Sequence, residues 1–309
     1  MLRTLLRAVP AIMLAVAATL TAPTATAATP HADLAADPAA PGPHPVAYTD
    51  LTVSASGRSY SARVWYPGAA AGANAPVAQG VHPGLAFGHG FLQNISTYES
   101  TLRHYASWGF ITVAPKSQGG LSPSHSGFAD DLNAALAWLT TQNATTGSRF
   151  AGAVDTSRYA LAGHSMGGGA ALLAASRNPA VKSVSTLAAA ETKPSAVTAS
   201  AALSVPVQYV GGSKDTIAGV DGHQRRMYDA KPAPTQLRVI TGGFHCGFTD
   251  SSGFGCDSGS ITRAEQQRLT RSVTTSYLLY TLGLDGSLHD QVWGAAARNL
   301  PGVVYTAKP

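Results

Sequence analysis

The sequence comprises 309 residues, of which 45% are hydrophobic and only 12% are charged, and its formal net charge is +5. The lysines and arginines are scattered along the chain, so we expect no nucleic-acid partner. After the N-terminal region no apolar run is long enough to cross a bilayer, which argues against stable membrane insertion. The length suits one large α/β domain, and we expect a monomer.

The first residues have the pattern of an export signal. Arg3 and Arg7 precede the apolar stretch AIMLAVAATL, which is too short to span a bilayer, and TATA ends at Ala27 with small residues that a signal peptidase accepts. We therefore predict a signal peptide over residues 1–27 and a secreted protein, with a membrane anchor as the alternative. The polar, proline-rich segment 28–45 predicts a flexible mature N-terminus.

Patterns of apolar residues predict the elements that follow. A hairpin of two strands, a buried strand and a helix come first, over 46–55, 59–67, 84–90 and 96–108. Strands and helices then alternate through the middle of the chain, over 110–115, 130–142, 158–164, 166–176 and 181–189. A strand, a helix, a strand and a long helix complete it, over 205–212, 221–230, 235–243 and 260–283, with Ser260 capping the last helix and Gly283 ending it.

This alternation predicts the fold class. Repeated βαβ units indicate an α/β protein with a mostly parallel central sheet of about eight strands and helices on both faces. In such sheets ligands bind beyond the carboxyl ends of the strands, so the loops that leave those ends are the ones to search for function. The segment 190–205 between two predicted strands is short, which predicts that no large lid covers this edge.

The stretch YALAGHSMGGG places a serine between two glycines at the junction of a strand and a helix. This is the setting of a nucleophile elbow, in which a sharp turn points the serine hydroxyl out of the sheet. Gly163 and Gly167 lack a Cβ and let neighbouring backbone approach closely. The N–H groups at the start of the following helix favour negative charge near Ser165. Ser165 is therefore the candidate nucleophile, and a glycine-rich packing turn is the alternative.

A serine nucleophile needs a base, and in the α/β-hydrolase fold the acid and the histidine follow the serine in the chain. VPVQYVGGSKD ends one predicted strand and delivers Asp215, and TQLRVITGGFH ends the next and delivers His245. Both side chains are expected at the same edge of the sheet as Ser165. The rival acids, both within a predicted helix, are Asp221 and Asp229. The rival histidines are His164, expected to point away, His223, expected on a helix surface, and His82, His104 and His125, which precede the serine.

Two backbone N–H groups are expected to hold the oxyanion that forms when Ser165 attacks a carbonyl. The N–H of Met166, at the start of the helix, is one of them. Phe91, in the loop GHGFLQN after the third strand, is the best candidate for the other, with simple loop packing as the alternative. The side chains of Phe91, Ala189 and Ile217 are apolar, and we predict that they line the site for the acyl chain.

Cys246 and Cys256 are the two cysteines of the chain, and in an exported protein they predict one disulfide. Two free thiols are the alternative. A disulfide that closes this short loop would stabilise the fold by about 2–3 kcal/mol and would restrain the segment that carries His245. Two cysteines do not make a zinc cage and the sequence has no HExxH motif, so we expect no metal. A serine, a histidine and an aspartate also need no organic cofactor.

Several of these motifs resemble the secreted polyester hydrolases, the bacterial cutinases and PET hydrolases. The resemblance extends over about residues 85–248 and rests on GHSMGGG, on GSKDTIAGV and on the order serine, aspartate, histidine. In that family the aspartate precedes a Thr-Ile-Ala run, as Asp215 does here. An aromatic residue, usually tyrosine, supplies the oxyanion-hole amide and matches Phe91. HGFLQN and SWGFITVAP are also similar to stretches of chlorophyllases and dienelactone-hydrolase-like enzymes.

Two features depart from the polyester-hydrolase pattern. The substrate-stacking tryptophan of that family has no counterpart in STLAAAETK, where Ala190 stands about at its place. Both cysteines follow the histidine, which is not the usual disulfide placement. The resemblance therefore implies ester hydrolysis but weakens the case for aromatic polyesters as substrates.

We predict that residues 46–309 form an α/β-hydrolase catalytic domain, which cleaves small-molecule or polymeric esters through Ser165, His245 and Asp215. One alternative is a secreted acyltransferase of the same fold, which passes the acyl group to an alcohol. A second is a chlorophyllase- or dienelactone-hydrolase-like esterase for small esters. A third, from another class, is a non-catalytic binding protein on the hydrolase scaffold.

Overall fold

The computed structural model describes residues 37–253 and 255–309. The predicted signal peptide, residues 1–27, and residues 28–36 of the predicted flexible segment lie outside the described residues. Among the helices described, none combines the length and the apolar character that a membrane span requires.

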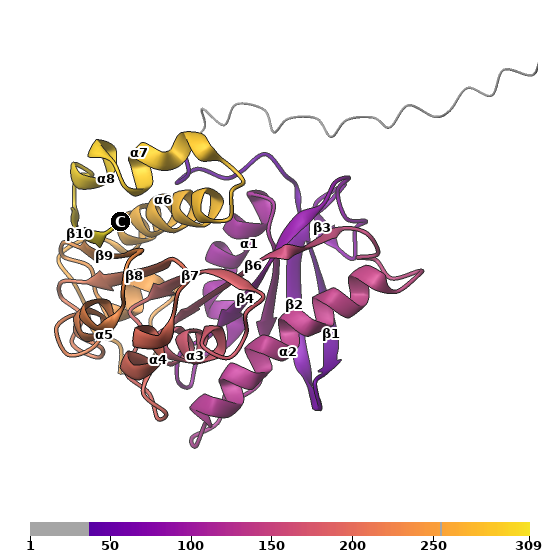
Figure 1. The fold of residues 1–309 in the computed structure, drawn as a ribbon, viewed down its shortest axis with the longest axis horizontal. Coiled ribbons are helices and arrows are strands. Elements are labelled where there is room, and N and C mark those ends of the chain that lie inside the picture. The colour runs from indigo at the N-terminus through magenta and orange to yellow at the C-terminus, as the bar shows by residue number, and fades with distance from the viewer. Residues whose placement is uncertain (1–36, 254) are drawn as a thin grey trace, which may run out of the picture. The chain divides into compact units, whose positions relative to one another are not determined.

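One ten-stranded sheet runs through the described chain in the order β10-β9-β8-β7-β6-β4-β5-β2-β1-β3 (Figure 1). Its earlier strands are β1 (Val46–Ala55), β2 (Arg58–Pro67), β3 (Gly72–Ala73), β4 (His82–Gly88) and β5 (Ile111–Pro115). The later strands are β6 (Val154–His164), β7 (Val181–Leu187), β8 (Val207–Gly212), β9 (Thr235–Ile240) and β10 (Val303–Lys308). The pairs from β5 through β4, β6, β7 and β8 to β9 are parallel, whereas β1 with β2, β2 with β5 and β9 with β10 are antiparallel.

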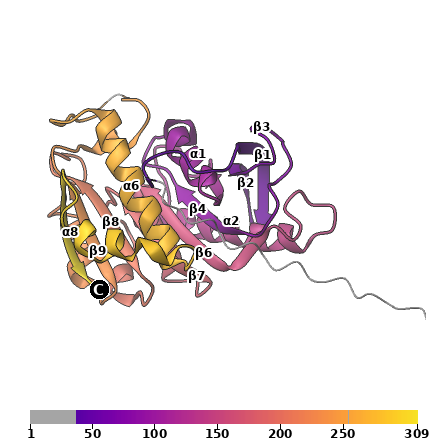
Figure 2. The ribbon, with the colours of Figure 1, turned by 90° about the horizontal axis from the view of Figure 1, so that it is seen from above.

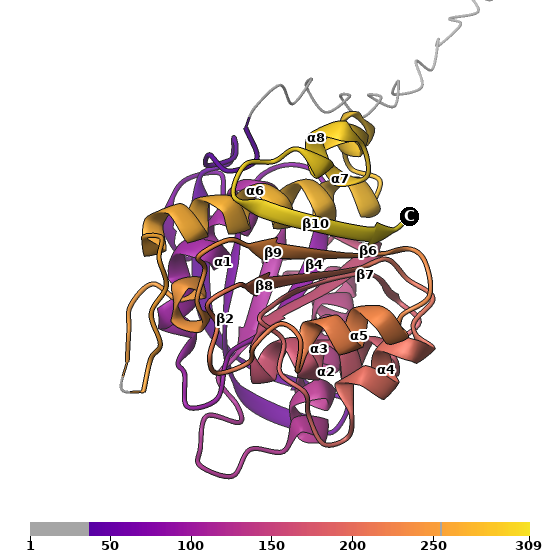
Figure 3. The ribbon, with the colours of Figure 1, turned by 90° about the vertical axis from the view of Figure 1, so that its left-hand side faces the viewer.

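Helices cover both faces of this sheet (Figure 3). One face carries α1 (Glu99–Ser107) and α6 (Arg263–Thr281), which contact each other (Figure 2). The other face carries α2 (His125–Ala144), α3 (Met166–Ala175), α4 (Ala196–Ala202) and α5 (Gln224–Ala230). Short helical turns complete the chain: η1 (Ile95–Tyr98), η2 (His245–Phe248), η3 (Gly286–Leu288), α7 (His289–Val292) and α8 (Ala295–Arg298). The predicted α/β fold, a mostly parallel sheet between two layers of helices, is therefore confirmed.

The centre of the sheet is apolar because it is covered on both sides. Strands β4, β5 and β8 are buried along their whole length, as expected for parallel strands between helical layers. Helix α3, with the sequence MGGGAALLAA, is also buried throughout and contacts β4, β6 and β7. The parallel strands β4, β6, β8 and β9 end at the same edge of the sheet, and the loops that leave them carry the candidate site.

The sheet has more strands than the eight or so that the sequence predicts. The additional strands are edge strands: β3 pairs two residues with β1, and β10 pairs with β9. Neither has a continuous apolar run, because an edge strand is covered less completely than a central one. The last helix begins two residues later than predicted, with Thr262 and not Ser260 as its N-cap; the Thr262 hydroxyl accepts the Glu265 N–H at 3.1 Å. It ends before Gly283, which has a φ of 66°.

Residues 37–45 are packed against α1. The indole of Trp108 donates to the carbonyl of Ala40 at 2.9 Å, and the N–H of Gly42 donates to the hydroxyl of Ser107 at 2.8 Å. These contacts differ from the prediction of a flexible segment that reaches residue 45. They exist because the end of α1 offers polar groups to the incoming chain, which the composition of the segment itself does not reveal.

Candidate active site

Ser165 stands at the turn between β6 and α3 in a backbone conformation that residues with a side chain rarely adopt. Its φ is 55° and its ψ is −121°. The Ser165 N–H donates to the carbonyl of Leu187 at 2.9 Å, and its own carbonyl accepts the N–H of Ala190 at 3.0 Å. These bonds to the end of β7 hold the turn in its strained conformation. The turn has the sharp geometry that the sequence predicts for a nucleophile elbow.

Glycines on both sides of Ser165 let this turn lie directly against β4. A Cβ placed on Gly167 would lie 2.2 Å from the backbone carbonyl of Gly88, and one placed on Gly163 would lie 2.4 Å from the carbonyl oxygen of Gly167. No side chain is accommodated at these distances. The glycines of the motif are therefore required by the packing of α3 against the carboxyl ends of β4 and β6.

Asp215 and His245 come from the loops after β8 and β9 and form a buried pair. The carboxylate oxygen Oδ2 of Asp215 lies 2.8 Å from Nδ1 of His245, and both side chains are almost fully enclosed. The other oxygen, Oδ1, accepts the backbone N–H groups of Ile217 at 2.9 Å and Ala218 at 2.7 Å. The aspartate is thus fixed by three donors. Because Nδ1 is engaged with it, Nε2 of His245 is the ring nitrogen that remains to accept a proton.

His164 connects the serine turn with the loop that carries His245. It precedes Ser165 in the chain, and the centroid of its ring lies 4.5 Å from that of His245. Its Nδ1 lies 2.8 Å from the hydroxyl of Tyr98. Complete burial, and secondarily the neighbouring His245, hold the pKa of His164 well below the ordinary value for histidine. His164 therefore does not point away, as the sequence suggests, but packs as a neutral ring between the two halves of the site.

The two amides predicted to bind an oxyanion belong to Met166 and Phe91. Met166 is the first residue of α3, so its N–H has no acceptor within the helix. Phe91 follows Gly90, whose N–H donates to the hydroxyl of Tyr98 at 3.0 Å. Because the same hydroxyl is bonded to His164, the loop of Phe91 is tied to the residue that precedes the serine. Both amides therefore remain candidates for this role.

The apolar residues predicted to contact substrate differ in their exposure. Phe91 and Ile217 are 46% and 48% exposed, and Leu92, which the sequence did not single out, is 52% exposed. Ala189, by contrast, is completely buried, with its Cα and Cβ 3.0 Å from the point that a Cβ on Gly168 would occupy. This contradicts the prediction that Ala189 lines the acyl site, because α3 covers its side chain.

The loop between β7 and α4, which contains Ala190, holds polar groups whose N–H donors are bound by histidines. The N–H of Glu191, which follows Ala190, donates to Nδ1 of His223 at 2.9 Å, and the N–H of Lys193 donates to Nδ1 of His125 at 3.1 Å. Burial lowers the pKa of His223 and so favours the neutral ring that accepts this bond. His223 is half-buried, unlike the solvated surface histidine that the sequence predicts.

The remaining alternatives to Asp215 and His245 that the sequence offers are not part of the Asp215–His245 pair. Asp221 and Asp229 are exposed. His82 and His104 lie within hydrogen-bonding distance of the backbone carbonyls of Ala78 and Pro38, respectively. Over residues 37–253 and 255–309, no three or more His, Cys, Asp or Glu side chains are grouped so as to hold a metal ion.

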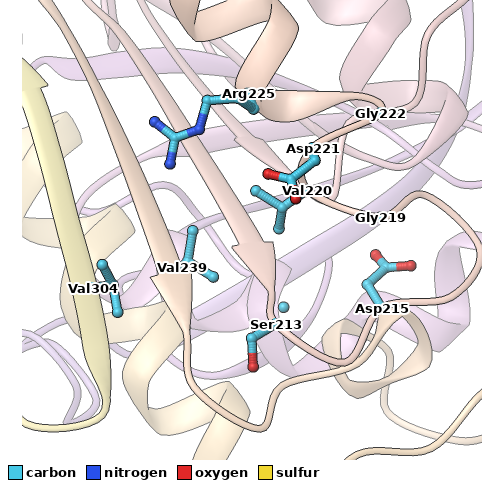
Figure 4. A pocket seen from close by; sticks show the side chains of 10 residues that line it. Ser213, Asp215, Gly219, Val220, Asp221, Gly222, Arg225, Val239 and Val304 are labelled. Atoms are coloured by element: carbon cyan, nitrogen blue, oxygen red, sulfur yellow. The ribbon is translucent and has the colours of Figure 1, made fainter.

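A hollow of about 470 Å³ borders the loop that carries Asp215 (Figure 4). Asp215 lies at one side of it and Val304 at the opposite side, with Asp221 and Arg225 between them and above. Ser165 and His245 do not line this hollow, so it is not the place where the serine, the histidine and the aspartate approach one another.

Cys246 and Cys256 form the predicted disulfide, which closes a loop directly after His245. The bridge joins η2, which contains Cys246, to the segment between η2 and α6, which contains Cys256. The guanidinium of Arg263, in the first turn of α6, donates to the carbonyl of Cys246 at 3.4 Å. The loop of the candidate base is therefore anchored both by the disulfide and by α6.

Two residues that the sequence analysis missed also hold this loop. Asp257 accepts the backbone N–H of His245 at 2.9 Å. Gln266, on α6 and fully buried, accepts the N–H of Phe244 at 2.9 Å and donates to its carbonyl at 2.7 Å. Their partners lie 12 and 22 residues away in the chain, and only the tertiary fold brings them together. No local motif marks either residue.

Comparison with known proteins identifies a matching family and several related proteins. The sequence model of the family described as PETase, PET hydrolase-like, matches residues 19–254. Cutinase est2 of Thermobifida alba is 34% identical over 135 residues, which are 44% of this chain and 42% of the relative. A cutinase of Thermobifida fusca is 29% identical over 207 residues, 64% of this chain and 65% of the relative. A bis(hydroxyethyl) terephthalate hydrolase of Streptomyces coelicolor is 28% identical over 203 residues, 64% of this chain and 59% of the relative. The chain spans about two fifths of the length of the Thermobifida alba cutinases that it matches.

Proposed function

The chain belongs to the PET hydrolase-like family, whose fold is that of the α/β-hydrolases, and on this premise we propose that it is a secreted serine ester hydrolase of the cutinase and polyester-hydrolase type. The observation that carries the proposal is the buried pair of Asp215 and His245, 2.8 Å apart, beside the strained turn that holds Ser165. Ser165 is the nucleophile, His245 the base and Asp215 the residue that orients it.

The first half of the reaction forms an acyl-enzyme. The hydroxyl oxygen of Ser165 attacks the ester carbonyl carbon while Nε2 of His245 takes the hydroxyl proton. The Asp215 carboxylate accepts a hydrogen bond from Nδ1–H, which stabilises the imidazolium. The N–H groups of Met166 and Phe91 bind the oxyanion of the tetrahedral intermediate, and losing one such donor costs about 3 kcal/mol of transition-state stabilisation. The intermediate collapses when His245 gives its proton to the leaving alcohol.

The second half releases the acyl group. Water takes the place of the alcohol, and Nε2 of His245 accepts one of its protons as the oxygen attacks the acyl carbon. The second tetrahedral intermediate expels the Ser165 oxygen, which recovers its proton from His245. The products are one carboxylic acid and one alcohol, and the enzyme returns to its starting state.

The surroundings of the site support an aliphatic acyl group over an aromatic one. The exposed side chains of Phe91, Leu92 and Ile217 offer apolar contacts for a chain of methylene groups. The sequence resemblance implies that Ala190, which has no aromatic ring, stands about where such a ring would stack on an aromatic ester. The relative from Streptomyces coelicolor is named for a terephthalate ester, so the choice between aliphatic and aromatic substrates is a direct experimental question.

Two observations support secretion. The first 27 residues have the pattern of a signal peptide, with a basic start, a short apolar core and small residues before the cleavage position. Cys246 and Cys256 form a disulfide, a bond that persists in oxidising compartments outside the cytosol.

The test is a hydrolysis assay with p-nitrophenyl esters of increasing chain length and with films of an aliphatic polyester and of PET. We expect hydrolysis of the aliphatic esters and the aliphatic film, and a loss of about 10⁴-fold or more in kcat for Ser165→Ala. A Ser165→Ala variant that keeps the wild-type rate would contradict the proposal. An acyltransferase would instead yield mainly the new ester when an acceptor alcohol is added.

A further inference from the structure

One carboxylate binds the backbone on both sides of the candidate acid and base. Oδ2 of Asp257 accepts the N–H of His245 at 2.9 Å and the N–H of Thr216 at 3.2 Å, and Oδ1 accepts the N–H of Cys246 at 3.0 Å. Thr216 directly follows Asp215. The side chain of Asp257 therefore spans the two loops whose tips must meet for the Asp215–His245 hydrogen bond to form.

The two loops are also joined nearer the sheet. The N–H of Ser213 donates to the carbonyl of Ile240 at 3.0 Å, and the N–H of Lys214 donates to the carbonyl of Gly243 at 2.7 Å. These bonds continue the pairing of β8 with β9 and fix where the loops leave the sheet. Beyond them, Asp257 bridges the loops at the level of the candidate catalytic side chains.

A carboxylate suits this position better than other polar groups. It only accepts hydrogen bonds, and its two oxygens offer about four lone-pair sites, enough for three N–H donors. Hydrogen bonds to an ionised acceptor are shorter and stronger than neutral ones. Asparagine has a single acceptor oxygen, and its NH₂ group would face an N–H donor. Substitution by asparagine thus removes at least one of the three bonds while changing the size of the side chain very little.

The disulfide determines where this carboxylate lies. Cys256 immediately precedes Asp257, and its partner Cys246 immediately follows His245. The two cysteines that the disulfide joins are therefore the chain neighbours of His245 and Asp257. The hydrogen bond between His245 and Asp257 lies directly beside the disulfide. The bridge holds Asp257 against the base loop, and Asp257 extends that attachment to the acid loop through Thr216.

We propose that Asp257 is a positioning residue for ester hydrolysis, which sets the spacing of Asp215 and His245 by binding the backbone beside each of them. This inference rests on the proposed function of His245 as the base. Misplacement of a catalytic group by about 1 Å lowers a rate by about 100-fold, so a residue that fixes this spacing affects the chemical step while leaving substrate binding nearly unchanged.

The kinetic test compares Asp257→Asn with a matched control, using p-nitrophenyl butyrate as substrate. We expect kcat of Asp257→Asn to fall about 30-fold while KM stays within about twofold. The control is Asp290→Asn, because the carboxylate of Asp290 also accepts two backbone N–H groups, those of Ala295 and Ala296 at the start of α8, and Asp290 contacts no residue of the candidate triad in these bonds. Its kcat is expected to stay within about twofold of wild type. Equal kcat for the two variants, or a loss matched by the folded fraction of Asp257→Asn, would overturn the inference.

Backbone hydrogen exchange tests the same inference without reference to activity. In the wild-type protein, the amide protons of Thr216, His245 and Cys246 should be protected, and in Asp257→Asn they should exchange at least about tenfold faster. Unprotected amides in the wild-type protein would contradict the inference even if no Asp257 variant folds. Ser165→Ala separates the two claims: if it keeps wild-type activity, the proposed function fails. If it is inactive while Asp257→Asn keeps its kcat, the positioning role alone fails.

Discussion

The serine side of the candidate site and its acid-and-base side are held in place by different kinds of contact. On the serine side, β4, β6 and α3 touch through the backbones of Gly88, Gly163 and Gly167, where a Cβ has no room. On the acid-and-base side, the loops after β8 and β9 are held by the side chains of Asp257 and Gln266, which follow His245 in the chain, and by the disulfide.

The difference has consequences for how each side responds to change. Backbone contact between glycines has no intermediate state, because a substituent either fits or forces the strands and the helix apart. Side-chain hydrogen bonds and a disulfide can be removed one at a time. We therefore expect substitutions on the serine side to remove fold and activity together, and substitutions on the other side to lower activity and stability in steps.

The largest effect is expected for Gly167→Ala, which tests the serine side. The new methyl group would lie 2.2 Å from the Gly88 carbonyl, so α3 and β4 must separate. We expect a loss of at least about 3 kcal/mol in the free energy of unfolding, measured in urea, and loss of ester hydrolysis. The control is Gly286→Ala, where a Cβ meets no atom within 4 Å. A stable and active Gly167→Ala protein would show that this backbone contact is not what fixes the turn.

The next effect is expected for Gln266→Leu, on the acid-and-base side. Leucine leaves the buried N–H and carbonyl of Phe244 without the partners that Gln266 provides. Each unsatisfied group costs about 1–3 kcal/mol, so we expect a total loss of about 3 kcal/mol with reduced but measurable hydrolysis. Gln142→Leu, near the end of α2, should change stability by less than about 1 kcal/mol. Unfolding curves of the two variants that coincide would contradict this assignment.

Removal of the disulfide should have a somewhat smaller effect. Cys246→Ser combined with Cys256→Ser opens a loop with a sequence separation of 10 residues. We expect a loss of about 2–3 kcal/mol and a decrease in Tm of roughly 5–8 °C, together with a partial loss of kcat because Asp257 is less well placed. Calorimetry and steady-state kinetics on the double variant measure both. A double variant with wild-type Tm and wild-type kcat would show that the disulfide neither stabilises the fold nor helps to position Asp257.

The smallest effect concerns His164, where the two sides touch. Burial keeps the pKa of His164 well below its value in the unfolded chain, about 6.5. Below that pH, the side chain of His164 binds a proton in the unfolded state but stays neutral in the folded state. Its stabilising contribution is complete above about pH 6.5 and is lost as the pH falls below that value. Tyr98 and His245 are the titratable groups that face it. We expect His164→Gln to lose less stability than wild type between pH 7 and pH 5. An equal loss in the two proteins would contradict a buried neutral His164.

Local patterns in the sequence single out the three residues of the candidate triad. Ser165 is marked by its two glycines at a strand–helix junction, and Asp215 and His245 each stand just after a run of strand-forming residues. Each of these features depends on a few neighbouring residues and on the order of the elements. Both can be read directly from the sequence. The same applies to the parallel sheet, because central strands are continuous apolar runs.

The features that the sequence did not reveal depend on contacts between distant segments. Ala189 is as apolar as an acyl-site residue should be, but the crossing of α3 buries it. Residues 37–45 have the composition of a linker, and only the end of α1 gives them partners. No motif marks Asp257 or Gln266, because the backbone groups that their side chains bind lie 12 and 22 residues away in the chain.

The most direct test of the account is active-site labelling with diethyl p-nitrophenyl phosphate, followed by peptide mapping in a mass spectrometer. The account predicts one adduct, on Ser165, whose rate of formation falls more than about 100-fold in both His245→Gln and Asp215→Asn. An adduct on another residue, or labelling of those two variants at the wild-type rate, would contradict it.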